Sequence, residues 1–204
     1  MFNFFKREKS QLLDSHEHAS YIQNQKKKTT NPEKISVWKN EEWDIKLNGF
    51  KEIFSRYIDI IDLQGKCIGL GARTGQEIAA LRELGFLDAT GVDLVPFPPY
   101  TIEGDFHNLP FTDQSVSFIY SNAVDHVRVP ELWAKEIHRI LLPGGYLLLN
   151  LQIGTAQDEY TVFEISNISK DLMPLFRDYE VVVNKEIPPN VHAMNWEVLF
   201  KKKS

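Results

Sequence analysis

Residues 67–105 read CIGLGARTGQEIAALRELGFLDATGVDLVPFPPYTIEGD, and this stretch decides the fold class. A short apolar run at its start leads into three closely spaced glycines, Gly69, Gly71 and Gly75, and a helical pattern follows them at once. A strand that leads into a glycine turn and then a helix is an arrangement that binds nucleotides. Glycine lets the backbone approach the ligand, and the helix N-terminus presents free N–H groups to it. The stretch therefore predicts a nucleotide-type ligand at the turn.

The next two strands predicted in this stretch lead to acids, Asp93 and Asp105. An acid about 20 residues after the glycine turn, at the end of the second strand, accepts hydrogen bonds from a ribose diol, and Asp93 lies close to that spacing. Enzymes that use nicotinamide cofactors carry the pattern GxGxxG, whereas the last gap here, from Gly71 to Gly75, is one residue longer. The spacing thus argues against a nicotinamide-dependent oxidoreductase.

Strands and helices alternate along much of the remaining chain. The expected strands span residues 66–70, 89–93, 101–103, 116–121, 146–152, 179–187 and 195–201, and the expected helices span 41–61, 75–84, 130–142 and 168–175. Strands separated by helices form a parallel sheet with right-handed crossovers, and the last two strands, with no helix between them, pair antiparallel. We therefore expect an α/β fold with a doubly wound, mostly parallel seven-stranded sheet and an antiparallel last strand.

The composition favours a single domain of ordinary globular type. The chain has 204 residues, of which 43% are apolar and 25% charged, and its net charge of −5 gives no indication of a nucleic-acid partner. The one cysteine, Cys67, leaves no disulfide to form and fits a reducing compartment. No apolar run approaches the roughly 18 residues of a membrane span. We expect a cytoplasmic protein, whose oligomeric state the sequence does not set.

Residues 1–40 differ from the rest of the chain. They are polar and charged, with a lysine run at 26–28 and no clear period, and we expect them to form a partly ordered N-terminal arm. The start, MFNFFKREK, has its apolar residues ahead of its charges, unlike a signal peptide, and is expected to fray.

Four blocks of sequence resemble the class I S-adenosylmethionine-dependent methyltransferases, and the small type 11 group most closely. The blocks are GLGARTG at 69–75, GVDLVP at 91–96, IEGDFHNLPFTDQSVSFIYSNAVDH at 102–126 and EIHRILLPGGYLLL at 136–149. The first block alone is weak, because many nucleotide-binding folds have such a loop. The other three in register make the resemblance specific. It implies a Rossmann-like methyltransferase domain over residues 41–204.

The resemblance also implies a binding site for S-adenosyl-L-methionine at the C-terminal ends of the strands. In that site the glycines would surround the methionyl end of the cofactor, Asp93 would bind the ribose and Asp105 the adenine amino group. The full set of implied cofactor-binding residues is Gly69, Gly71, Arg73, Gly75, Asp93, Leu94, Asp105, Phe106, Ser121 and Asn122.

Two positions depart from the pattern of this family. The family usually has an acid where this chain has Gly69, and a glycine where it has Arg73. The missing acid removes one partner of the cofactor's amino group, and Arg73 puts a long cation into the turn, where it can reach a carboxylate instead. An alternative to the enzyme is therefore a non-catalytic relative that binds the cofactor or a protein partner.

His126 and Asp125 are the candidate catalytic residues. They follow the strand expected at 116–121 and face the predicted cleft, and a histidine has a pKa suited to proton transfer near neutral pH. The alternative for His126 is a loop histidine bonded to the backbone. For His107 we favour this second interpretation, a loop histidine bonded to the backbone. His138 is expected to be exposed to solvent on its helix.

The remaining expectations concern metals and the methyl acceptor. No HxxxH or CxxC spacing occurs, and His16, His18 and His192 show no grouping, so no metal site is predicted. The short chain leaves only residues 1–48, 123–130 and 153–167 to build the acceptor pocket, which suits a small-molecule acceptor. Trp38 and Trp43 are candidates for its lid, although aromatic residues at helical spacing more often belong to a core.

Overall fold

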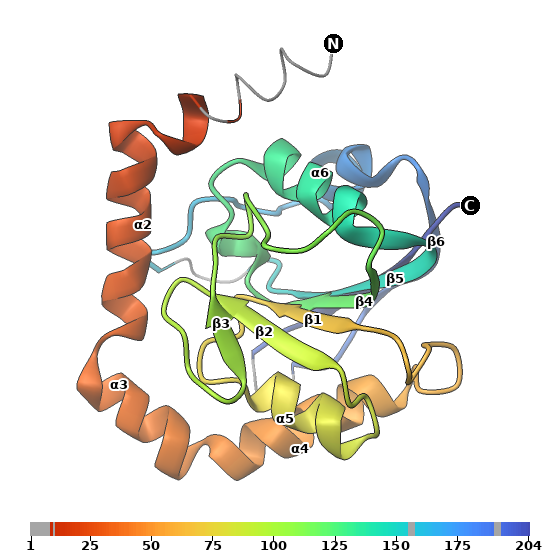
Figure 1. Cartoon of the computed structure of the whole chain (residues 1–204), viewed down its shortest axis with the longest axis horizontal. Helices are drawn as coiled ribbons and strands as arrows, with labels where there is room; N and C mark the ends of the chain where they lie inside the picture. Colours follow the sequence, from red (N-terminus) through yellow and green to blue (C-terminus); the bar gives the residue numbers. More distant parts are fainter. Residues whose placement is uncertain (1–8, 10, 155–157, 190–192) are drawn as a thin grey trace.

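Seven strands form one mixed sheet at the centre of the molecule, in the order β3-β2-β1-β4-β5-β7-β6 (Figure 1). Their bounds are β1 Cys67–Leu70, β2 Ala89–Asp93, β3 Thr101–Glu103, β4 Val116–Ser121, β5 Leu141–Leu151, β6 Tyr179–Glu186 and β7 Trp196–Lys202. β1 to β5 pair in parallel, whereas β7 runs antiparallel to both of its neighbours. This confirms the predicted α/β class with a mostly parallel sheet and an antiparallel last strand.

The computed structural model describes residues 9, 11–154, 158–189 and 193–204. Residues 1–8 and His192, for which the sequence made predictions, lie outside the described residues. Among the described helices, none combines the length and the apolar character needed to cross a membrane.

Helices cover both faces of the sheet (Figure 1). Helices and short helical turns span α2 His16–Thr29, α3 Pro32–Ser36, η1 Val37–Glu41, α4 Trp43–Ser55, α5 Gln76–Glu83, η2 Val124–His126, α6 Pro130–Ile140, η3 Ile168–Leu172 and η4 Met173–Phe176. α4 and α5 pack on one face, and α6 with the turn η4 packs on the other. Each packing helix buries an apolar stripe, such as Phe50 and Phe54 on α4 or Trp133 and Ile137 on α6.

Three predicted helices differ from the structure in their bounds. The helix expected to run to residue 142 ends at Ile140, and β5 begins at Leu141, which pairs with Val116. The cause is Pro143, because a proline disfavours helical conformation in the residue before it and the chain is already extended at Leu141. The helix expected at 41–61 is α4 followed by turns, and that expected at 168–175 is two short helical turns.

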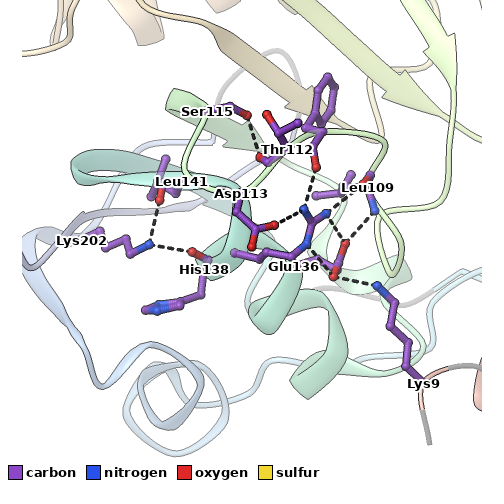
Figure 2. A network of polar contacts seen from close by, with 11 residues as sticks. Lys9, Leu109, Thr112, Asp113, Ser115, Glu136, His138, Leu141 and Lys202 are labelled. Carbon is purple, nitrogen blue, oxygen red and sulfur yellow. Dashed lines mark hydrogen bonds and ion pairs between the residues drawn. The ribbon is translucent and has the colours of Figure 1, made fainter. Parts of the chain in front are cut away.

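A polar network fastens the loop after β3 to α6 (Figure 2). Glu136 accepts hydrogen bonds from the backbone N–H of Leu109 at 2.9 Å and from the Lys9 ammonium at 2.7 Å. Arg139 donates to the carbonyl of Leu109 and to the carboxylate of Asp113, each at 2.9 Å. The loop that carries Asp105 is therefore held against α6, whose apolar face is buried on the sheet, as a site on a rigid scaffold requires.

The N-terminal segment expected to be a partly ordered arm carries α2, which stands beside the layered sheet (Figure 1). The side chain of Ser15 caps this helix by accepting a hydrogen bond from the N–H of His18. His18, Tyr21 and Gln25 are its buried residues, and their spacing of three and four places them on one helical face.

Candidate functional site

A cavity of about 400 Å³ lies at the C-terminal ends of β1, β2 and β4, where parallel sheets place their ligands. The predicted site residues that line it are Gly71, Arg73, Asp93, Leu94, Phe106, Asn122, Asp125 and His126. Its other wall includes Tyr21, Gln25 and Lys28 of α2. Lining residues come from all three segments that the sequence left for an acceptor pocket, so these segments do meet at one cavity. That the cavity takes a methyl acceptor stays a prediction.

The glycine turn after β1 forms one wall of the cavity. Gly71 has a φ of +73°, and a Cβ at this residue would lie 2.5 Å from the Cβ of Ala123, closer than real side chains approach. Gly75 has a φ of +86°, and a Cβ there would collide with Tyr100. Both positions therefore require glycine, for conformation and for space.

Arg73 lies in the same turn with a φ of +45°, a conformation that non-glycine residues adopt only at a cost. A glycine would adopt this conformation without that cost. Its guanidinium group lies over the ring of Trp38, 4.3 Å from the ring centroid, and both residues line the cavity. The cation therefore sits on an aromatic face in the cavity wall, which is a stabilising arrangement for arginine.

Asp93 ends β2 beside this turn. Its two carboxylate oxygens accept hydrogen bonds from the backbone N–H groups of Arg73 and Val95, at 2.8 and 3.0 Å. Burial raises the pKa of Asp93 above its ordinary value, although these two bonds oppose the change. Each oxygen retains capacity for a further hydrogen bond, as binding of a ribose diol requires.

The structure brings His18 to Asp105 and His107, which lie two residues apart after β3, although the sequence showed no grouping for His18. Nε2 of His18 and Nδ1 of His107 each lie 2.7 Å from an oxygen of Asp105. The N–H of Val129 donates to Nε2 of His107 at 3.1 Å, and Arg128 lies 3.4 Å from Nδ1 of His18. Both histidines therefore carry their hydrogen toward Asp105.

This cluster has the composition of a metal site, with its three ligand atoms within 4.8 Å of one another. The chain of hydrogen bonds accounts for the cluster by itself, because each ring nitrogen already has a partner. Burial raises the pKa of Asp105, but the bonds from His107 and His18 outweigh it and lower the pKa overall. The absence of a metal site stays a prediction, as does the role of Asp105 at the adenine.

His126 lies at the end of η2 on the acceptor side of the cavity. Its Nδ1 lies 3.1 Å from the carbonyl oxygen of Tyr160, and the Lys28 ammonium lies 3.4 Å from its Nε2. Burial lowers the pKa of His126, Asp125 raises it and Lys28 lowers it, with a net lowering. The imidazole is thus held neutral near pH 7, with its Nε2 lone pair turned to the Lys28 side. Lys28 in turn pairs with Asp158 at 2.8 Å.

The sequence missed the part that α2 plays in closing the cavity. The Tyr21 hydroxyl donates to the carbonyl of His126, and the Gln25 amide donates to the carbonyl of Tyr160, both at 2.8 Å. The buried face of α2 is polar, so a search for apolar periodicity passes over it. The helix cap at Ser15 was the local signal that an ordered helix begins there.

Other predicted residues contribute to the framework of the site. The Ser121 hydroxyl donates a hydrogen bond to the carbonyl of Leu70 and accepts one from the N–H of Ala123. Both partners are backbone groups of the protein, so this side chain fastens the end of β4 to the end of β1. Gly69 lies within β1, against the side chain of Ile78. Trp38 is buried and lines the cavity, as one of the two lid candidates.

Comparison with known proteins bears on these observations. Residues 68–149 match the family model of a methyltransferase domain. Malonyl-[acyl-carrier protein] O-methyltransferase 1 of Coxiella burnetii is 34% identical over 101 residues, which make up 46% of this chain and 36% of that relative. The match therefore spans little more than a third of the relative's length.

Solved structures show the same fold. The 1,6-didemethyltoxoflavin-N1-methyltransferase of Burkholderia thailandensis, bound to 1,6-didemethyltoxoflavin and S-adenosylhomocysteine, aligns with a TM-score of 0.69 at 16% identity, over 93% of this chain and 90% of that one. The [4+2]-cyclase SpnF aligns with a TM-score of 0.59 at 13% identity, over 75% of this chain and 80% of that one. One of these proteins is a cyclase, so proteins of this fold catalyse different reactions. The reaction of this chain therefore has to be argued from its site.

Proposed function

We propose that this chain, whose residues 68–149 match the family model of a methyltransferase domain, transfers the methyl group of S-adenosyl-L-methionine to a small-molecule acceptor. The observation that carries the proposal is one cavity with two unlike walls. One wall is the glycine turn with Asp93, and the other is α2 with His126. A cavity with both walls has room for residues that bind the cofactor and residues that bind an acceptor, which supports the proposal.

The residues on the cofactor wall fit this cofactor. Gly71 leaves the turn free of a side chain where a ligand must approach the backbone. Asp93 offers carboxylate oxygens to hydroxyl groups, and Phe106 provides an apolar surface in the same cavity. When bound, S-adenosyl-L-methionine supplies an electrophilic methyl group on a sulfonium.

The protein's own part in such a reaction is to orient the acceptor and to remove its proton. Methyl transfer needs the acceptor atom in line with the methyl group, so enclosure of the acceptor by α2 and η2 contributes most by positioning and by excluding water. His126 is the proposed general base, because its Nδ1 faces the Tyr160 carbonyl and its lone pair is therefore on Nε2, where an acceptor proton would take the place of the Lys28 contact. The nearby Lys28 ammonium can stabilise negative charge that develops on the acceptor.

We propose an acceptor whose reacting atom is the oxygen of a hydroxyl group, which gives its proton to His126 as the methyl group is transferred. The neutral base and the adjacent cation suit that chemistry, and the name of the Coxiella burnetii relative, an O-methyltransferase, agrees with it. The other relative named above is an N1-methyltransferase, so nitrogen acceptors are the comparison to include in a screen.

The test begins with calorimetric titration of S-adenosylmethionine and S-adenosylhomocysteine into the purified protein. We expect binding, and an affinity reduced about tenfold or more in Asp93→Ala, because a hydrogen bond to a charged group contributes about 1.5–3 kcal/mol. Asp88→Ala is the matched control, since Asp88 is exposed and pairs with Lys66. Equal affinity in Asp93→Ala would remove the ribose assignment.

The same preparation then decides between an enzyme and a non-catalytic relative. Oxygen and nitrogen acceptors are offered with cofactor carrying a labelled methyl group, and we expect labelled product from an oxygen acceptor that depends on His126. A wild-type protein that binds neither cofactor form would contradict the proposal and favour a relative that binds a protein partner.

A further inference from the structure

Glu77, in the first turn of α5, is a buried acid that the proposed reaction does not use. Glu77 is 4% exposed and lines the same cavity as the glycine turn. Within the described residues, the hydrogen bond that its carboxylate accepts comes from its own backbone N–H. An acid buried with so little compensation has to keep its proton or to pair with a cation that arrives from the cavity.

The place of Glu77 follows from the absence of a side chain at Gly69. A Cβ at Gly69 would lie 2.9 Å from Cδ1 of Ile78 and 3.4 Å from Cγ of Glu77. The side chain of Glu77 therefore lies against the backbone of β1 at Gly69. This is the end of the cavity at which the methionyl part of the proposed cofactor would lie.

The charges around Glu77 prepare it to ionise when a cation binds. Burial raises the pKa of Glu77 to about 8, while the positive charges of Arg73 and Lys46 act to lower it and Asp93 acts to raise it. Near pH 7 the carboxyl group therefore holds its proton in the free protein. An ammonium group placed beside it would release that proton and leave an ion pair.

We propose that Glu77 binds the α-ammonium group of S-adenosylmethionine and S-adenosylhomocysteine, so that an acid from α5 serves where β1 offers none. The inference rests on the proposed function, because it needs a ligand with an ammonium group at that end of the cavity. Arg73 in the same wall is the complementary cation, beside which the ligand's α-carboxylate is favoured.

Comparing two ligands distinguishes binding of the ammonium group by Glu77 from a general effect of the substitution on the cavity. S-adenosylhomocysteine carries the α-ammonium group, whereas 5′-methylthioadenosine has the same nucleoside and sulfur but no amino-acid end. We expect Glu77→Gln to weaken binding of S-adenosylhomocysteine by about tenfold or more, the effect of losing a charge-assisted bond, and to leave binding of 5′-methylthioadenosine unchanged. Glu83→Gln is the matched control on the same helix, because Glu83 is exposed and pairs with Lys51.

Two further readouts test the same residue without activity. Calorimetry in two buffers of different ionisation enthalpy should show that the wild type releases a proton on binding S-adenosylhomocysteine at pH 7 and that Glu77→Gln does not. Thermal unfolding of the ligand-free variant should occur at the same or a higher temperature than in the wild type, because the substitution removes a buried acid.

The outcomes are distinct for the two proposals. Equal loss of affinity for both ligands together with a lower melting temperature would make Glu77 a structural residue and overturn the inference. Unchanged affinity for S-adenosylhomocysteine in Glu77→Gln would also overturn it, while leaving the cofactor site in place. A wild-type protein that binds neither ligand would instead overturn the proposed function on which the inference rests.

Discussion

The two walls of the cavity are built in different ways. The cofactor wall, formed by the glycine turn, α5 and the end of β2, is made by residues close together in sequence. Its key bond, from the Arg73 N–H to Asp93, spans 20 residues. The acceptor wall, formed by α2 with the loops around His126 and Tyr160, includes bonds that span 87 residues, from His18 to Asp105, and 135 residues, from Gln25 to Tyr160.

This difference predicts different stabilities. The cofactor wall belongs to strands whose side chains are buried in the apolar core, so it should open only when the whole domain unfolds. Within the acceptor wall, α2 is held to the domain chiefly by polar contacts, and such elements open locally at lower free energy. A wall that opens on its own would also admit the acceptor.

Gly71→Ala should have the largest effect, because it damages the rigid wall. The new Cβ meets Ala123 in a turn with a φ of +73°, and strain together with overpacking is expected to cost about 2–4 kcal/mol of unfolding free energy. Gly144→Ala is the matched control, since Gly144 has a φ of +78° and a Cβ added there would meet nothing within 4 Å. Denaturant unfolding measures both, and equal losses would show that space at Gly71 is unimportant.

His18→Ala should have an intermediate effect confined to the acceptor wall. It removes a bond to the charged Asp105, so we expect the opening free energy of α2 to fall by about 1–3 kcal/mol. Hydrogen exchange should show faster exchange in α2 and unchanged protection in β4. His16→Ala, an exposed position on the same helix, is the control. Equal acceleration in β4 would show that α2 and the sheet unfold as one unit.

Acidification should have the smallest effect and should also act on the acceptor wall. The pKa of His126 is lower in the folded protein than in the unfolded chain, so the unfolded chain binds more protons below about pH 6.5 and stability falls as the pH falls through the folded pKa. Lys28, Asp125 and Asp158 are the charges that face it.

Hydrogen exchange in α2, corrected for the intrinsic effect of pH, should therefore rise between pH 7.5 and 5.5. His126→Gln should remove most of this dependence, whereas His138→Gln, an exposed position in α6, should leave it intact. A pH dependence that survives His126→Gln would assign the effect to another group.

The cofactor wall could be predicted because its requirements are local. A turn that needs positive φ at Gly71 and Gly75 selects glycine, and strands separated by helices must run parallel, which brings Asp93 and the turn to one edge of the sheet. The bounds of helices and strands were less well predicted where two local signals competed. At Leu141 the helical pattern continued, but Pro143 and pairing with Val116 ended the helix earlier.

The acceptor wall and the chemistry of the buried acids were decided only when distant segments packed together. Nothing in the residues near His18 indicates that it meets Asp105, because that bond joins two segments 87 residues apart. Glu77 likewise reads as an ordinary polar residue of a helix start until packing against β1 at Gly69 buries it in the cavity. Backbone conformation is set by neighbours in the chain, whereas the environment that shifts a pKa or closes a cavity is set by neighbours in space.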